Sequence, residues 1–355
     1  MLLMSSGRPS DPSGGTRSGD LEPKSLRRVF MDLVGRPPFA SEREEWMGRS
    51  REELVNALLS EREFWENWLE DQLYYFLLVD GFRPRAEGVV SLPVDLAERR
   101  IGVIESLHRI CLSSSFDRRN PGPDTFVTVV MEQLLGVKIR SNLRELEIGK
   151  RVYDGGRGNF LGRVGNSQAD VVRIAIEDQR TLRHFLRREH SRWLRIEPGA
   201  AEVEKWAELL GSTPLCFDAI VRDWFLSSRY EARLGTSRIL PNRLFIRALF
   251  TDLCDRPPTE EETNLLRSAL DGLADPTPLR SLVARILLGS GKVTLPSLAE
   301  LQDLQQWISG EFESLLGRSP TARESAIFLE SAKEPACRAE TILLAILTHP
   351  EYQSW

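Results

Sequence analysis

The segment with the most unusual composition reads Tyr-Asp-Gly-Gly-Arg-Gly-Asn-Phe-Leu-Gly and spans residues 153–162. Backbone N–H groups in a glycine-rich turn can form a concave nest for an anion, and a nearby arginine adds positive charge. The residues that would form this anion site are Gly155, Gly156, Arg157 and Gly158. No Gly-Lys-Ser/Thr follows, so the segment is not a Walker loop. A structural loop is the favoured interpretation, and an enzyme that binds a phosphorylated ligand through residues 155–162 is an alternative.

A second candidate site is a basic segment between Arg180 and Arg195. It contains six arginines and two histidines against a single acid, Glu189. The arginines are Arg180, Arg183, Arg187, Arg188, Arg192 and Arg195. On a helix the first three share one face, which could meet phosphate groups or an acidic partner. A solvated helix face balanced by acidic helices is the favoured interpretation, so polyanion or nucleic-acid binding through Arg180–Arg195 is kept as an alternative.

The residue types that usually perform catalysis do not form recognisable sets. His184 and His190 are six residues apart and would not share a helix face as two zinc ligands do. The four cysteines form no C-x-x-C pair, C-x-x-C-H is absent, and no Gly-x-Ser-x-Gly occurs. Apolar residues flank each cysteine, which predicts buried thiols. We therefore expect no catalytic residue, no metal and no cofactor.

The composition is that of a globular protein. The chain has 355 residues, of which 41% are hydrophobic and 28% charged, and its formal net charge is -5. This balance gives no global reason to expect nucleic-acid binding. No apolar run approaches the roughly 18 residues that a membrane-spanning helix needs. The apolar run at residues 1–4 is too short to form the core of a secretion signal. A cytoplasmic location is expected, with an envelope location as the alternative if translation starts further upstream.

Internal repetition is the main structural signal. Three segments share an apolar helix end, a turn residue, an arginine and a proline, and an acidic helix and a second apolar stretch follow each one. These segments are Val29–Pro38, Leu249–Pro258 and Phe312–Pro320. The second apolar stretches are Leu54–Ser60, Leu282–Leu288 and Ile342–Leu347. Two weaker copies combine Trp193–Pro198 with Ile220–Tyr230, and Met131–Gly136 with Val171–Ile176. The repetition predicts helix–turn–helix units packed through their apolar stripes.

Simple backbone chemistry explains the turn residues. Gly35 and Gly317 stand where a helix ends with positive φ, and Asp255 takes that place in another copy. The prolines that cannot continue the helix are Pro37, Pro257 and Pro320. Two Thr-x-x-Glu capping boxes are predicted to start the next helix, and they pair Thr259 with Glu262 and Thr321 with Glu324. In the first copy Ser41 and Glu44 are the predicted cap. Asp32 and Asp252 are equivalent residues, which we expect to bond to a neighbouring cap.

The first copy also resembles a known family. Residues 26–38 followed by residues 54–68 match the pattern Arg-Arg-aromatic-x-Asp-Leu-x-Gly-x-Pro-Pro and the later Leu-Leu-x-Ser, aromatic and Trp of a planctomycete cytochrome-associated domain of unknown function. The other copies are similar to a helical repeat of surface-layer-associated bacterial proteins. The resemblance implies a helical domain, often exported and fused to haem domains, and it carries no defined catalytic residue.

Together these observations predict an all-α fold of repeated helix–turn–helix units in a compact multi-helix assembly. The best candidate for a strand is Phe126–Val130. The expected organisation is a disordered tail (1–22), a first helical unit (23–82), a middle region with insertions (83–236) and a C-terminal pair of units (237–355). The expected function is that of a non-enzymatic scaffold or interaction module whose partner is another protein.

Overall fold

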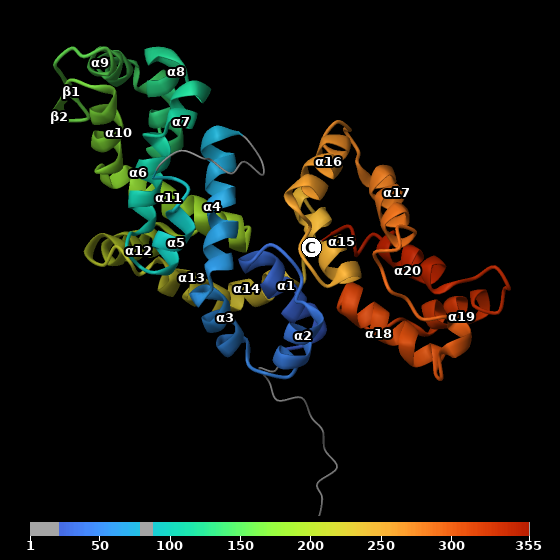
Figure 1. Ribbon diagram of the computed structural model, residues 1–355. Helices are drawn as coiled ribbons and strands as arrows, with labels where there is room; N and C mark the ends of the chain where they lie inside the picture. Colours follow the sequence, from blue (N-terminus) through green and yellow to red (C-terminus); the bar gives the residue numbers. More distant parts are fainter. Residues whose placement is uncertain (1–20, 79–87, 355) are drawn as a thin grey trace, which may run out of the picture.

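The computed structural model describes residues 21–78 and 88–354, and this part of the chain is all-α, as the sequence predicts (Figure 1). It contains twenty α-helices and a single two-stranded hairpin. The tail predicted for residues 1–22 lies outside the described residues, apart from its last two positions. Leu21 is buried there, and its N–H donates to the carbonyl of Arg49.

Four stretches of the described chain have the same order of three helices, and we call them units A to D. Unit A contains α1 (Pro23–Leu33), α2 (Ala40–Trp46) and α3 (Arg51–Ser60). Unit B contains α11 (Gln179–Leu194), α12 (Ala200–Ser212) and α13 (Phe217–Leu226). Unit C contains α15 (Asn242–Cys254), α16 (Glu260–Leu270) and α17 (Thr277–Leu288). Unit D contains α18 (Leu304–Leu316), α19 (Ala322–Ser331) and α20 (Ala339–Leu347).

The remaining helices extend or connect these units. Unit A runs on into α4 (Arg62–Leu77), unit B into α14 (Ser228–Leu234), and a 3-10 turn, η3 (Leu298–Glu300), precedes unit D. Between units A and B lie α5 (Leu92–Ala97), α6 (Val103–Cys111), α7 (Ser114–Arg119), α8 (Gly122–Val129), the π-helical η1 (Val130–Leu134), the 3-10 turn η2 (Ile139–Ser141), α9 (Leu143–Tyr153), β1 (Gly158–Phe160), β2 (Arg163–Gly165) and α10 (Gln168–Ile176).

The best strand candidate in the sequence, Phe126–Val130, is not a strand, because these residues belong to α8 and η1. Their β-branched side chains favour a strand locally, but the buried residues recur at helical spacing through Leu134. The only strands in the described chain form the β1–β2 hairpin, which pairs Gly158 with Gly165. Sequence analysis missed this hairpin because each strand is only three residues long.

The third helix of every unit buries the same pattern of positions, i, i+1, i+4 and i+5. The buried sets are Leu54, Val55, Leu58 and Leu59 on α3; Ile220, Val221, Trp224 and Phe225 on α13; Val283, Ala284, Leu287 and Leu288 on α17; and Ile342, Leu343, Ile346 and Leu347 on α20. Helix α3 packs on α13, and α17 packs on α20. Units A and B therefore form a first module, and units C and D form a second.

The hydrophobic core divides along the same line. One cluster of buried apolar residues runs from Leu21 to Tyr230, so the unit predicted at 23–82 and the region predicted at 83–236 share one core. The other cluster runs from Leu240 to Tyr352 and takes in only Met31 from the first module. Figure 1 shows the second module as a separate lobe beside α1. We call the boundary between the two lobes the seam.

Polar contacts dominate the seam. The guanidinium of Arg243 reaches Asp71 at 2.8 Å and also bonds to Glu70, both on α4. Arg247 donates to both carboxylate oxygens of Glu70 at 2.7 Å. The N–H of Ala40, where α2 begins, donates to the carboxylate of Asp255 at 2.8 Å. The two lobes are therefore joined mainly by charged groups, with a small apolar contribution.

Candidate functional sites

The predicted turn residues end helices with positive φ. The φ angles are 74° at Gly35, 70° at Gly317 and 49° at Asp255. Gly35 also has no room for a side chain, because a Cβ there would come within 2.4 Å of the amide oxygen of Asn67. A Cβ on Gly317 would come within 2.6 Å of the Cα of Lys24. The turns thus combine a left-handed conformation with close packing, and glycine meets both demands.

The capping boxes of α16 and α19 have both of their hydrogen bonds. The Thr259 N–H donates to Glu262 at 2.9 Å and the Thr321 N–H donates to Glu324 at 2.7 Å, and each threonine hydroxyl accepts from the glutamate N–H at 3.2 Å. The cap predicted at Ser41 and Glu44 is wrong. Helix α2 begins two residues earlier than this cap predicts, after Phe39, and the Phe39 N–H donates to the carboxylate of Glu42.

The same glutamates take part in an ion pair that sequence reasoning missed. In three units an arginine after the positive-φ residue binds the glutamate six positions later through two nitrogens. The pairs, which we call the turn ion pairs, are Arg36–Glu42, Arg256–Glu262 and Arg318–Glu324. Each arginine also donates to the carbonyl of the next residue and lies over a phenylalanine ring of the preceding helix. The Arg-x₅-Glu spacing is the sequence signal for this contact.

The equivalent aspartates hold side chains from neighbouring units. Asp32 accepts from the hydroxyl of Tyr230 at 2.8 Å and binds the guanidinium of Arg233, and all three groups are buried. Asp252 accepts from the hydroxyl of Tyr352 at 2.9 Å and binds Arg27 through two nitrogens at 2.8 Å. The expected bond to a helix cap is therefore wrong. The carboxylates join units instead. Burial of the two tyrosines, together with the charge of the adjacent aspartate, raises the pKa of both hydroxyls well above the usual value.

Most arginines of the basic segment already have carboxylate partners. Arg180 binds Asp178, Arg183 binds Glu204, and Arg188 and Arg192 bind the fully buried Glu189. Burial opposes ionisation of Glu189, but the two arginines and Gln72 hold its pKa below the usual value. Arg187 is exposed, and the described residues offer it no carboxylate at ion-pair distance. The segment is therefore largely a structural ion-pair network, which leaves a single guanidinium of the predicted face for an external anion.

The glycine-rich segment forms the β1–β2 hairpin and its approach from α9. The N–H groups of Gly155 and Gly156 donate to backbone carbonyls of α9 at 3.1 and 2.9 Å. The N–H of Leu161, in the hairpin turn, donates to the carboxylate of Glu145 at 3.0 Å. A Cβ on Gly158 would come within 2.7 Å of Val152. These N–H groups of the predicted nest are therefore already hydrogen-bonded within the protein. Close packing against α9 explains why residue 158 is a glycine.

The remaining candidates for chemistry are dispersed. Cys111 is buried, which raises the pKa of its thiol, but the other three cysteines are only half-buried, so the expectation of four buried thiols is wrong. Burial and the adjacent Arg188 lower the pKa of His184 to about 4. Within residues 21–78 and 88–354 no cluster of three or more His, Cys, Asp or Glu side chains could hold a metal, and no helix is long and apolar enough to cross a membrane.

The exposed surface of α17 distinguishes unit C from the other units. Leu282 and Ile286 lie one turn apart on its outer face and are 49% and 62% exposed. The equivalent positions, one residue before the first and third buried residues, are occupied by small, polar or charged side chains in the other units. They are Glu53 and Ala57 on α3, Ala219 and Asp223 on α13, and Thr341 and Ala345 on α20. The apolar pair on α17 is thus not a requirement of the unit's own packing.

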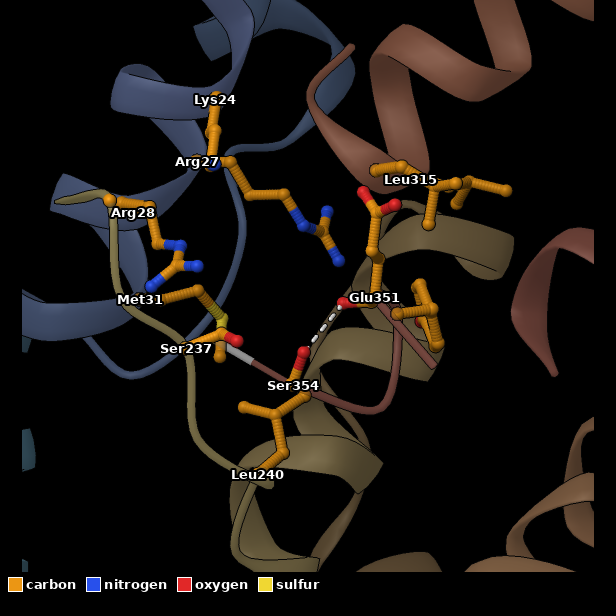
Figure 2. Close-up of a pocket in the computed structure, with 12 residues that line it drawn as sticks. Lys24, Arg27, Arg28, Met31, Ser237, Leu240, Leu315, Glu351 and Ser354 are labelled. Carbon is orange, nitrogen blue, oxygen red and sulfur yellow. Dashed lines mark hydrogen bonds between the residues drawn. The ribbon is translucent and has the colours of Figure 1, made fainter. Parts of the chain in front are cut away.

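A small cavity lies at the seam. Its volume is about 140 Å³, and α1, the segment between α14 and α15, the end of α18 and the C-terminal segment surround it (Figure 2). Three basic residues of α1 line it: Lys24, Arg27 and Arg28. This cavity could not be predicted from the sequence, because its walls come from segments that are distant along the chain.

Comparison of the chain with models of known families, with curated proteins and with solved structures found no match. The resemblance of residues 26–68 to the planctomycete cytochrome-associated domain therefore stays a prediction.

Proposed function

We propose that the chain is a non-enzymatic scaffold whose helical units are copies of one design, and that unit C docks another protein through the outer face of α17. The observation that carries this proposal is the pair Leu282 and Ile286. Exposed large aliphatic side chains at adjacent turns are costly to leave in water unless another surface covers them. The three other units avoid them at the same positions, so the α17 pair serves something other than folding.

The chemistry of the face suggests what the partner presents. Arg285 is exposed beside Leu282 and Ile286, and the described residues place no carboxylate within ion-pair distance of it. A partner helix with apolar side chains three or four residues apart would cover the aliphatic pair. A carboxylate at the edge of that helix would meet Arg285, which favours correct orientation and faster association more than raw affinity. The proposed partner is therefore an amphipathic, acidic helix.

The experiment compares the double variant Leu282→Glu/Ile286→Glu with the matched control Thr341→Glu/Ala345→Glu, which places the same charges on the equivalent face of α20. Proteins retained from a lysate by the wild-type chain and both variants are measured by quantitative mass spectrometry. We expect at least one protein to bind the wild type and the control and to be lost, by tenfold or more, with the α17 variant. Retention of the same proteins by all three chains, or of none by the wild type, contradicts the proposal.

Sedimentation velocity on the same three proteins tests whether the partner is a second copy of the chain. If the wild type and the control are dimers and the α17 variant is a monomer, the face joins two copies. If all three are monomers, the partner is a different protein, and the lysate comparison identifies it. A dimer that persists in the α17 variant shows that self-association uses another surface and contradicts docking of a second copy on this face.

A further inference from the structure

The cavity at the seam has a basic wall in which some of the positive charges are paired with carboxylates and others are not. Arg27 is bound by Asp252, and the acidic residue on the opposite side, Glu351, is bound by Arg318 at 2.8 and 2.9 Å. Arg28 is 9% exposed, and its only hydrogen bond in the described chain goes to the carbonyl of Thr236 at 3.0 Å. No carboxylate of the described residues lies within ion-pair distance of Arg28 or of Lys24.

The surroundings of Arg28 make its charge costly. Burial lowers the pKa of Arg28, and the nearby guanidinium groups of Arg233 and Arg27 lower it further. Asp32 opposes this effect, but its carboxylate is already shared by Arg233 and Tyr230. A buried guanidinium with one neutral partner is unusual, since buried charges are normally paired. Arg28 is one of the residues that line the cavity, where an oxyanion could bind.

We propose that this cavity binds one small oxyanion of the phosphate type, with Arg28 as the main donor and Lys24 as a second positive charge. A guanidinium matches two oxygens of a phosphate group at once. Pockets for drug-sized ligands measure roughly 300–1,000 Å³ and a single water needs about 10–15 Å³. A cavity of about 140 Å³ therefore has room for a phosphate group and is smaller than a pocket for a drug-sized ligand. This site is independent of the face on α17.

Because both lobes line the cavity, a bound anion would contact both of them. Lys24 and Arg28 belong to the first module, whereas Leu315, Glu351 and Ser354 belong to the second (Figure 2). A bound anion would lie between two basic residues of α1 and the backbone and side chains of the C-terminal segment. Binding would therefore stabilise the joined arrangement of the two lobes by mass action.

Isothermal titration calorimetry with inorganic phosphate tests the site in the full chain, at constant ionic strength kept with chloride. We expect one saturable site in the wild type, at least tenfold weaker binding in Arg28→Gln, and about threefold weaker binding in Lys24→Gln. The matched control is Arg323→Gln, which removes an exposed cation on α19 and should leave binding unchanged. Absence of a saturable signal, or equal affinity in Arg28→Gln, overturns the proposal.

A further arm distinguishes a free ion from a phosphate ester. Glycerol phosphate that binds as tightly as inorganic phosphate assigns the site to a small phosphate monoester, and binding of inorganic phosphate alone assigns it to the free ion. Both results support an oxyanion site.

A second variant keeps the test decisive if Arg28→Gln does not fold. Ser237 lines the cavity and is exposed, so Ser237→Asp supplies a carboxylate beside the basic wall. We expect this variant to melt at a higher temperature than the wild type without phosphate and to lose the phosphate signal. An unchanged or lower melting temperature together with retained phosphate binding contradicts the proposal.

Discussion

The two modules use the same aspartate–tyrosine contact but obtain the cation for it differently. In the first module Asp32 binds Tyr230 and Arg233, which are both supplied by unit B and its extension. In the second module Asp252 binds Tyr352 of its own C-terminal segment, but the arginine is Arg27 of the first module. The buried carboxylate of the first module is therefore paired with an arginine of the same module. The second module completes the same arrangement only when it is joined to the first, and this explains a seam rich in polar contacts.

The largest expected effect is the loss of the internal contact. Asp32→Asn should lower the free energy of unfolding by about 3–5 kcal/mol, because it removes the carboxylate opposite the buried Arg233. Asp252→Asn should cost less, about 1–3 kcal/mol, because the Arg27 side chain is 15% exposed and water can replace part of the bond. Urea unfolding at pH 7 measures both. Equal costs, or a larger cost at Asp252, would show that the two modules are not asymmetric in this way.

The turn ion pairs give a second comparison between the modules. Arg36 is 6% exposed on its side chain and binds two carboxylates, Glu42 and Glu63. Arg256 is 38% exposed and binds one, Glu262. Arg36→Gln should therefore cost about 2–3 kcal/mol, since it leaves a buried pair broken, whereas Arg256→Gln should cost less than about 1 kcal/mol. Unfolding curves in urea check the order, and a larger loss for Arg256→Gln would contradict it.

Acid should remove the contribution of the turn ion pair in unit D. Hydrogen bonds from Arg318 hold the pKa of Glu324 down at about 2, below its ordinary value of 4.5. A carboxyl with a depressed folded pKa adds stability above its unfolded pKa and loses it as the pH falls. The difference in unfolding free energy between the wild type and Glu324→Gln should be at most about 1 kcal/mol, as for an exposed pair. This difference should have its full size above pH 4.5 and decrease toward pH 2. A difference that is constant from pH 7 to pH 2.5 would exclude this origin.

The sequence predicts what depends on local chemistry. The all-α fold and the helix ends at Gly35 and Gly317 follow from periodicity and backbone preferences within a few residues, as do the capping boxes of Thr259 and Thr321. The hairpin escaped because three-residue strands carry no detectable alternation. The Asp32–Tyr230 contact could not be predicted because the two residues are 198 positions apart and neither local sequence indicates the other as a partner.

The sites show the same limit. The basic segment stood out by composition, yet the structure pairs most of its arginines with acids that are distant in the sequence or buried beside them. In the sequence, Leu282 and Ile286 belong to an apolar stretch that is typical of a helix buried in a core. Only the structure shows that these two side chains are exposed whereas Val283 and Leu287 are buried. Which side of a helix a fold leaves uncovered is a property of long-range packing, so the two proposed sites had to come from the structure.

The central claim is that α17, and not its equivalents, is the docking face. Hydrogen–deuterium exchange with and without the captured partner tests it most directly, because it reports each helix of the same chain. We predict that binding slows exchange in residues 277–288 while residues 51–60 and 339–347 keep their rates. Protection confined to other helices, with residues 277–288 unchanged, would contradict the account.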